Sequence, residues 1–314
     1  MDVGTMVKTG ESSSPDVVEL PEILRVFETS LSEIKWKLRP SSKRRFETDI
    51  LALITEMRPV IMVDYGGKMP ELQDRLCSFL NYCKKESPFF EHLKVMVIED
   101  MIYLVHARAF AEFIHSSLHF DTEMVLMNIE QDPPKIVAQN DKDSVAEELV
   151  SIQKKFSAVF GSSLGKNDPP QLEGGYLTTD ARSSSESSGF IDLSSWTTES
   201  GVTIPTLNGW LLGYPVVYFF SKEHIEDAIY NLSTKCLNLY QILIIRSGTS
   251  NGRGSRWEEL MSFSVPYDQS VEGSSEPWAK AFLLRMQTKI ERCKHVWGSL
   301  RMEVSSCYPQ AIAL

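Results

Sequence analysis

Three residues have side chains suited to acid, base or nucleophilic chemistry and stand beside predicted turns: Asp64, Tyr214 and His224. Asp64 follows the apolar run at 60–63 and precedes two glycines, and ligands often bind where a buried strand ends. A local role as a turn or cap residue is the alternative, because Asp favours such positions for its own hydrogen bonds. Catalytic groups are defined by geometry, so these three form a site only if the fold brings them together.

A second set of residues has the ligand types of a metal site. Glu112, His115 and His119 follow one another at intervals of three and four in and just after a helix predicted at 107–118, which puts them near one face. Carboxylate and imidazole groups that converge in this way suit zinc. The pattern His-Glu-x-x-His is absent, and Ile114 and Leu118 compete for the inward face. These three are the candidate ligands, and the expectation is that the chain holds no metal.

Two basic segments offer anion chemistry without a recognised motif. Residues 35–45 carry a run of Lys and Arg that suits phosphate binding or nuclear import, and a solvated junction between helices is the alternative. The loop at 247–256 combines glycines with Arg253 and Arg256, which fits either an anion site or a plain soluble loop. The sequence has no glycine-rich phosphate-binding motif, so we expect no cofactor.

The composition bounds the class of protein. The chain has 314 residues, of which 42% are hydrophobic, and this is enough to bury a sizeable core. Its net charge of −10 argues against nucleic acid as the main partner, because phosphate binding depends on clustered Lys and Arg. The five cysteines include no Cys-x-x-Cys pair, which predicts reduced thiols rather than a zinc or redox motif.

The elements that would position these side chains are organised around residues 208–220, NGWLLGYPVVYFF, the most apolar and aromatic stretch of the chain. We interpret it as two buried strands on either side of a bend at 213–215, because aromatic and β-branched residues favour strands. Pro215 should begin the second strand, since proline does not donate to a sheet ladder. Ser221 then caps a helix whose apolar stripe extends to Cys236.

This block and the following sequence SKEHIEDAIYNLS resemble an uncharacterised eukaryotic family typified by the chromosome 1 open reading frame 74 protein, a domain of unknown function. The resemblance covers most of the chain from about Arg45 onward, apart from the Ser-rich middle. It implies no established activity, no cofactor and no catalytic residues.

The order of the other patterns predicts strands mixed with helices. An N-terminal helical pair precedes several pairs of strands that are each followed by a helix. Hairpin-linked strands imply a mixed sheet with helices packed on its faces, so the predicted fold class is α+β or α/β. We expect a disordered tail at 1–16, a single globular domain in two halves at 17–160 and 207–314, and a Ser- and Gly-rich disordered insertion at 161–206.

Two hypotheses about function follow. The first is a non-enzymatic soluble intracellular protein that acts through an unidentified protein partner, because no nucleophile, base and orienting group share a local context. The alternative is a small hydrolase or transferase whose site assembles only in three dimensions, and a pocket that gathers Asp64 or His224 would favour it. The N-terminus lacks an apolar secretion segment, so we expect a cytoplasmic location, with the nucleus as the alternative, and no membrane association.

Overall fold

A computed structural model describes residues 19–118, 124–137, 144–161, 189–198, 200–247 and 256–310. The first of its sheets has four strands in the order β1-β3-β2-β6. β1, β3 and β2 are antiparallel neighbours, and β6 joins β2 in parallel. The strands are β1 (Val60–Met62), β2 (Leu93–Ile98), β3 (Met101–His106) and β6 (Phe190–Asp192).

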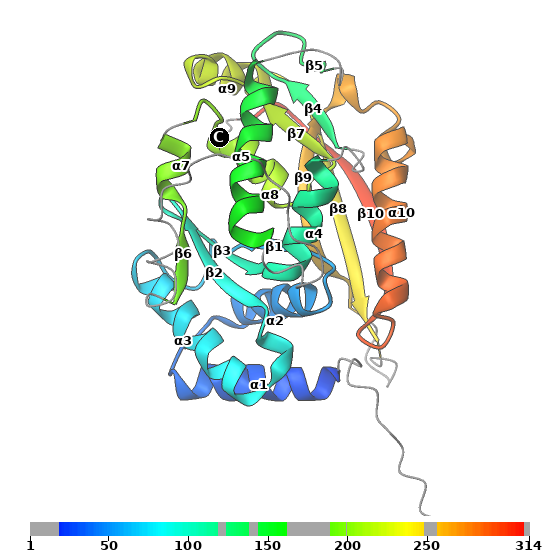
Figure 1. The fold of residues 1–314 in the computed structure, drawn as a ribbon. Helices are drawn as coiled ribbons and strands as arrows, with labels where there is room; N and C mark the ends of the chain where they lie inside the picture. The colour runs from blue at the N-terminus through cyan, green and yellow to red at the C-terminus, as the bar shows by residue number, and fades with distance from the viewer. Residues whose placement is uncertain are drawn as a thin grey trace, which may run out of the picture.

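Helices cover both faces of this sheet (Figure 1). Along β2, Val95 and Val97 join one core cluster and Met96 and Ile98 join the other, as the alternation of side chains along a strand requires. The first cluster includes α1 (Leu20–Glu33), α2 (Pro40–Ile54) and α3 (Glu71–Glu86), and the second includes α4 (Ala107–Leu118), α5 (Ser144–Phe160) and α8 (Ile204–Leu211). Burial on both sides explains the long apolar runs at 95–98 in β2 and 101–105 in β3.

The second sheet is antiparallel and carries the C-terminal third of the chain. Its strands are β8 (Leu237–Arg246), β9 (Glu258–Pro266) and β10 (Trp297–Cys307), in the order β10-β8-β9. Helix α10 (Pro277–Arg292) packs on one face of this sheet through a stripe of residues at helical spacing, all buried: Trp278, Phe282, Met286 and Ile290. The spacing of four between these residues is typical of a helix with one inward face, as the structure shows.

The third sheet is small and has the order β5-β4-β7, with β4 and β7 parallel. Its strands are β4 (Val125–Asn128), β5 (Lys135–Ile136) and β7 (Val216–Phe219). The remaining elements are α7 (Ser194–Thr198), α9 (Ile225–Ser233) and the short 3-10 turns η1 (Pro88–Phe90), η3 (Lys222–His224), η4 (Tyr267–Gln269) and η5 (Gly273–Ser275). None of the described helices combines the length and apolar character needed to span a membrane.

The mixed α and β class is confirmed, but the strands form three small sheets and the central block is only half strand. Trp210 and Leu211 lie in α8, not in a strand. An extended Thr203 before the helix and Pro205 in its first turn start α8, and Gly213 at φ +71° follows its end. The block lacks a polar face because α8 is buried among aromatic side chains, which removes the helical signature from the sequence.

Residues 190–206 correct the predicted insertion. The described residues among them, 190–198 and 200–206, include β6, α7 and the start of α8, and Leu193 and Val202 are buried in the second core cluster. Short elements that complete an existing sheet need little apolar sequence of their own, so composition alone assigned them to the insertion. Residues 162–188 and the predicted tail lie outside the described residues.

Candidate ligand-binding cleft

A cleft of about 420 Å³ lies between α10 and the turn from α2 to β1. Residues 54–59 form one wall, α10 and the residues after it form the opposite wall, and α4 and the α8–β7 turn close the space between them. The apolar part of the lining includes Phe113, Met261, Phe282 and Met286. A hollow of this volume that combines an apolar wall with polar groups suits a small molecule.

Basic side chains dominate the charged part of the lining. Arg58, Arg285, Lys289 and Arg292 face two carboxylates, Glu56 and Glu112. The cleft is therefore cationic in a chain whose net charge is −10. Arg285 also lies over the ring of Phe282, with its guanidinium carbon 5.3 Å from the ring centroid, so α10 holds this arginine against the apolar wall.

Lys289 is anchored across the cleft by the turn after α2. Its Nζ donates hydrogen bonds to the backbone carbonyls of Glu56 at 3.1 Å and Met57 at 3.2 Å. Burial, together with the neighbouring guanidinium of Arg285, lowers the pKa of Lys289 to about 8. Partial desolvation makes the charged ammonium of Lys289 unfavourable, and a bound anion would stabilise that charge.

Arg58 lies at the inner end of the same turn and is only 5% exposed. Its Nη1 donates to the carbonyl of Leu260 at 3.0 Å, but its Nε has no hydrogen-bond partner among the described residues. Burial lowers the pKa of Arg58, yet a guanidinium stays charged in proteins. A buried cation with an unused donor that lines a cleft is costly for a fold without a ligand.

Asp49 of α2 provides part of the opposite charge beneath the cleft. Its Oδ2 accepts hydrogen bonds from Tyr65 Oη at 2.6 Å and from Arg45 Nε at 3.1 Å, whereas Oδ1 has no partner among the described residues. Burial raises the pKa of Asp49, and the charges of Arg45 and Arg58 oppose this rise. The two incompletely paired groups, Asp49 and Arg58, are thus electrostatic neighbours inside the protein.

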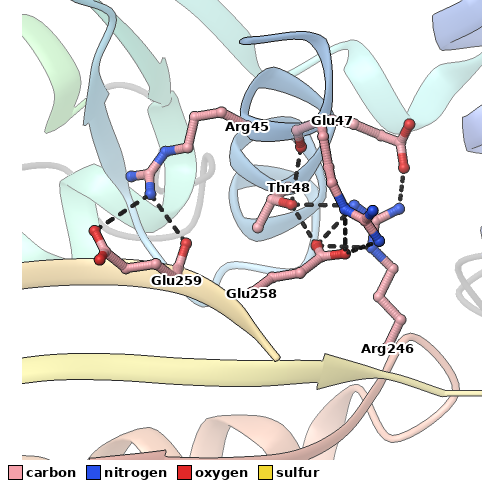
Figure 2. Close-up of polar contacts among 7 residues, drawn as sticks. Arg45, Glu47, Thr48, Arg246, Glu258 and Glu259 are labelled. Carbon is pink, nitrogen blue, oxygen red and sulfur yellow. Dashed lines mark hydrogen bonds and ion pairs between the residues drawn. The ribbon is translucent and has the colours of Figure 1, made fainter. Parts of the chain in front are cut away.

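A separate ionic network fixes α2 to the second sheet (Figure 2). Arg246 of β8 pairs with Glu47 and Glu258, and Thr48 donates to Glu258 Oε2 at 2.6 Å. Beside it, Arg45 Nη1 lies 3.7 Å from Glu259 Oε1. These contacts set the position of α2, and therefore that of the turn which carries Glu56, Met57 and Arg58.

The structure does not bring the three predicted catalytic candidates together in the cleft. Asp64 is exposed after β1. Tyr214 is half-buried against Phe263 with ring centroids 5.6 Å apart, and burial raises the pKa of its hydroxyl while nearby Arg58 opposes the rise. His224 is exposed and pairs with Asp227 at 2.9 Å, which raises its pKa. Tyr214 is nearest, because it directly follows the lining residue Gly213.

The structure shows the positions of two of the three predicted metal ligands, Glu112 and His115. Glu112 is exposed, forms an ion pair with Arg108 at 3.4 Å, and lines the cleft. His115 is exposed on the same helix, and His119 lies outside the described residues. Across the described part of the chain, no three His, Cys, Asp or Glu side chains gather as metal ligands.

Sequence reasoning missed both Arg58 and Lys289. Arg58 stands in a plain helix-to-strand turn. Lys289, like Lys280, Arg292 and Lys294, lies off the apolar stripe of the last helix, where the sequence alone predicts a solvent face. The one available signal was the spacing of Arg285, Lys289 and Arg292 at four and three residues, since a helix face with several basic residues is open to an anion. The contact between this helix face and the α2–β1 turn forms only in the folded protein, so the sequence does not predict it.

One family model covers the whole cleft. Residues 28–314 match the family model described as a domain of unknown function, DUF4504. The chain belongs to this family. The DUF4504 match includes every residue that lines the cleft, and it confirms the sequence-based assignment to an uncharacterised family. No curated protein and no solved structure matches the chain.

Proposed function

We propose that this protein binds a small anionic molecule, a carboxylate or a phosphate, in the cleft between α10 and the α2–β1 turn. The observation that carries the proposal is the set of cations that line the cleft, Arg58, Lys289 and Arg292, of which Arg58 is only 5% exposed. An anion in the cleft would add negative charge beside these cations and accept hydrogen bonds from those that it reaches.

The apolar lining adds a size and shape to this ligand. Phe282, Met286 and Phe113 provide a wall against which a hydrocarbon or ring portion packs, while Lys289 and Arg292 stand where an acidic group would reach them. A ligand with one acidic end and a compact apolar body therefore matches the lining better than a bare ion. Such a ligand gains most from the charged groups because the site around them is partly dry.

The proposal keeps the non-enzymatic part of the sequence-based hypothesis and assigns a small molecule to the cleft. The alternative, a hydrolase or transferase, needs a nucleophile, and Cys293 has that type among the lining residues. Burial raises the pKa of the Cys293 thiol to about 11, and its Sγ lies 3.2 Å from the carbonyl of Lys289 as a hydrogen-bond donor. A neutral thiol held in this way is a poor nucleophile, which supports binding over chemistry.

Thermal unfolding with two probe anions tests the proposal. Inorganic phosphate and citrate, each compared with sodium chloride at equal ionic strength, should raise the Tm of the full chain, because a ligand that binds only the folded state stabilises it. The stronger of the two probes separates a phosphate site from a carboxylate site. No rise in Tm with either anion would contradict the proposal.

A charge-matched pair of variants locates the effect. Arg292→Ala and Lys294→Ala each remove one positive charge near the end of α10, but only Arg292 lines the cleft. The anion-dependent rise in Tm should shrink in Arg292→Ala and in Lys289→Met, and should persist in Lys294→Ala. An equal loss in Lys294→Ala would mean that the anion responds to overall charge instead of the cleft.

A further inference from the structure

Strand β10 forms an open edge of the second sheet over eleven residues. It pairs with β8 on one side, and no strand of the described residues pairs with its other side (Figure 1). It contains no proline and no lysine, and its irregularity is confined to the start, between Trp297 and Ser299. These are the devices that usually keep an edge strand from pairing, so this edge is unprotected along most of its length.

The hydrogen-bond alternation shows which backbone groups point outward. Tyr267 N donates a hydrogen bond to Cys236 O, which shows that the even-numbered residues of β8 bond to β9. Ser247 N donates to Val296 O at the other end of the strand, which shows that the odd-numbered residues of β8 bond to β10. The register pairs odd with odd across β8 and β10, for example Gln241 with Glu303. The free N–H and C=O groups of β10 therefore belong to its even-numbered residues: Gly298, Leu300, Met302, Val304 and Ser306.

The side chains of β10 are divided between two faces in the same way. Leu300, Met302 and Val304 turn toward the core beneath α10, yet all three are only partly buried. Arg301 and Glu303 occupy the opposite, exposed face and form an ion pair at 2.5 Å. Arg301 also lies over the ring of Trp257 at 4.1 Å, which holds its side chain flat on the sheet.

We propose that two copies of this protein pair through β10, antiparallel, about a two-fold axis at Met302. In this register Met302 faces its own copy, and Leu300 faces Val304 of the second copy, which completes the burial of the apolar side chains. Arg301 faces Glu303 of the second copy and Glu303 faces Arg301, so the exposed face carries two cross-strand pairs of opposite charge. The result is one continuous six-stranded antiparallel sheet with an isologous interface.

Charge selects this register over its neighbours. An axis at Arg301 or Glu303 would lie at a residue whose backbone groups already bond to β8, and it would set like charges directly opposite each other, which destabilises a strand pair. An axis at Leu300 or Val304 would keep the outward groups facing one another but would not place Arg301 opposite Glu303. The axis at Met302 also joins outward-facing groups to outward-facing groups from Gly298 to Ser306. Two antiparallel copies of β10 are therefore complementary to each other in both hydrogen bonding and charge.

Proline substitution tests the pairing without removing a backbone hydrogen bond of the monomer. Met302→Pro deletes an N–H that points outward, and proline is tolerated on an edge strand at such a position. The variant loses only the partly buried Met302 side chain from the core, so it should still unfold cooperatively, and it should be monomeric in sedimentation equilibrium at concentrations where the wild type is dimeric. Ser305→Pro is the comparison, because its N–H bonds to β8 and its loss should lower the Tm.

A charge swap tests the register. Arg301→Glu and Glu303→Arg should each weaken the dimer by about tenfold, because each replaces two attractive pairs with two repulsive ones. The double variant Arg301→Glu/Glu303→Arg restores opposite charges in the proposed register and should restore the dimer. A wild type that stays monomeric across the micromolar range, a Met302→Pro variant that stays dimeric, or a double variant no better than the single ones would overturn the proposal.

Discussion

Arg246 of β8 and Glu258 of β9 form a buried ion pair, with Nη2 and Oε2 2.9 Å apart, and both contact Thr48 of α2. They are 12% and 8% exposed at the side chain. Burial alone would raise the pKa of Glu258, but the hydrogen bond from Thr48 and the charge of Arg246 lower it overall. The pair therefore joins the helix that positions the cleft to the sheet whose open edge we assign to dimerisation.

The first prediction concerns this pair. Arg246→Met leaves a buried carboxylate with fewer partners and should reduce the free energy of unfolding by about 3–5 kcal/mol in urea titrations. Arg246→Met with Glu258→Gln removes both charges and should recover part of the loss, which a double-mutant cycle measures. A single-variant cost below about 1 kcal/mol, typical of exposed ion pairs, would show that the pair is not structural.

The same pair predicts a dependence on acid. The pKa of Glu258 is lower in the folded state than its ordinary value, so the unfolded chain binds protons more readily. Its contribution to stability is present above the unfolded pKa and is lost as pH falls through the folded pKa. Glu258→Gln should therefore lose less stability than the wild type between neutral and acidic pH.

His106 predicts a second acid-sensitive step at higher pH. Burial, with the nearby His92, lowers the pKa of His106 from 6.5 to about 4, and its Nδ1 accepts a hydrogen bond from Ala109 N at 3.1 Å. The neutral form is favoured on folding, so stability is full above pH 6.5 and falls as pH decreases toward 4. The shift corresponds to about 3 kcal/mol over this window.

His106→Asn is the variant that isolates this effect. Asn keeps an acceptor for the first turn of α4 but does not titrate. Urea unfolding across the window should give a flatter pH dependence in the variant than in the wild type, even where its absolute stability is lower. Parallel curves would mean that another group carries the acid sensitivity.

The sequence predicted most elements because each has a local signal. The apolar residues of α10 recur at helical spacing, and the apolar runs of β2 and β3 indicate buried strands. Local signals failed where burial is complete or where the partner is distant in sequence. The last turn of α8, Gly209 to Leu211, is buried, and its aromatic and aliphatic residues favour a strand by sequence alone. Lys289 meets Glu56 only after the chain has folded, so the cleft left no pattern in the sequence either.

The ordered segment at 190–206 changes the expected result of a deletion. From composition, removal of 174–201 should leave a folded protein, because loop length itself costs little. The structure adds β6, which pairs with β2, and buried Leu193 to the deleted segment. We now expect removal of 174–188 to leave the Tm nearly unchanged and removal of 174–201 to lower it clearly, and equal Tm values for the two would contradict this.

Lys289 predicts how anion binding responds to pH. Its pKa of about 8 means that the ammonium loses its proton within an accessible range. Affinity for sulfate, whose charge is constant there, should fall as pH rises through about 8. Calorimetric titration of wild type and Lys289→Arg measures this, and the arginine variant should keep its affinity at the higher pH because a guanidinium stays charged. A wild-type affinity independent of pH would exclude Lys289 from the site.

Val217 tests the packing of the central block. It is fully buried in β7, and the absence of a side chain at Gly209 lets α8 approach it, since an added Cβ would lie 3.1 Å from Val217 Cγ1. Val217→Asp places an unpaired charge in this contact and should give insoluble protein or a chain without a cooperative transition. Val217→Ile adds one methylene to the same tight space and should fold with a loss of about 1–3 kcal/mol. Comparison of soluble yield and thermal unfolding for the two variants decides the matter: a well-folded Val217→Asp protein would mean that β7 presents a surface for binding instead of lying in the core.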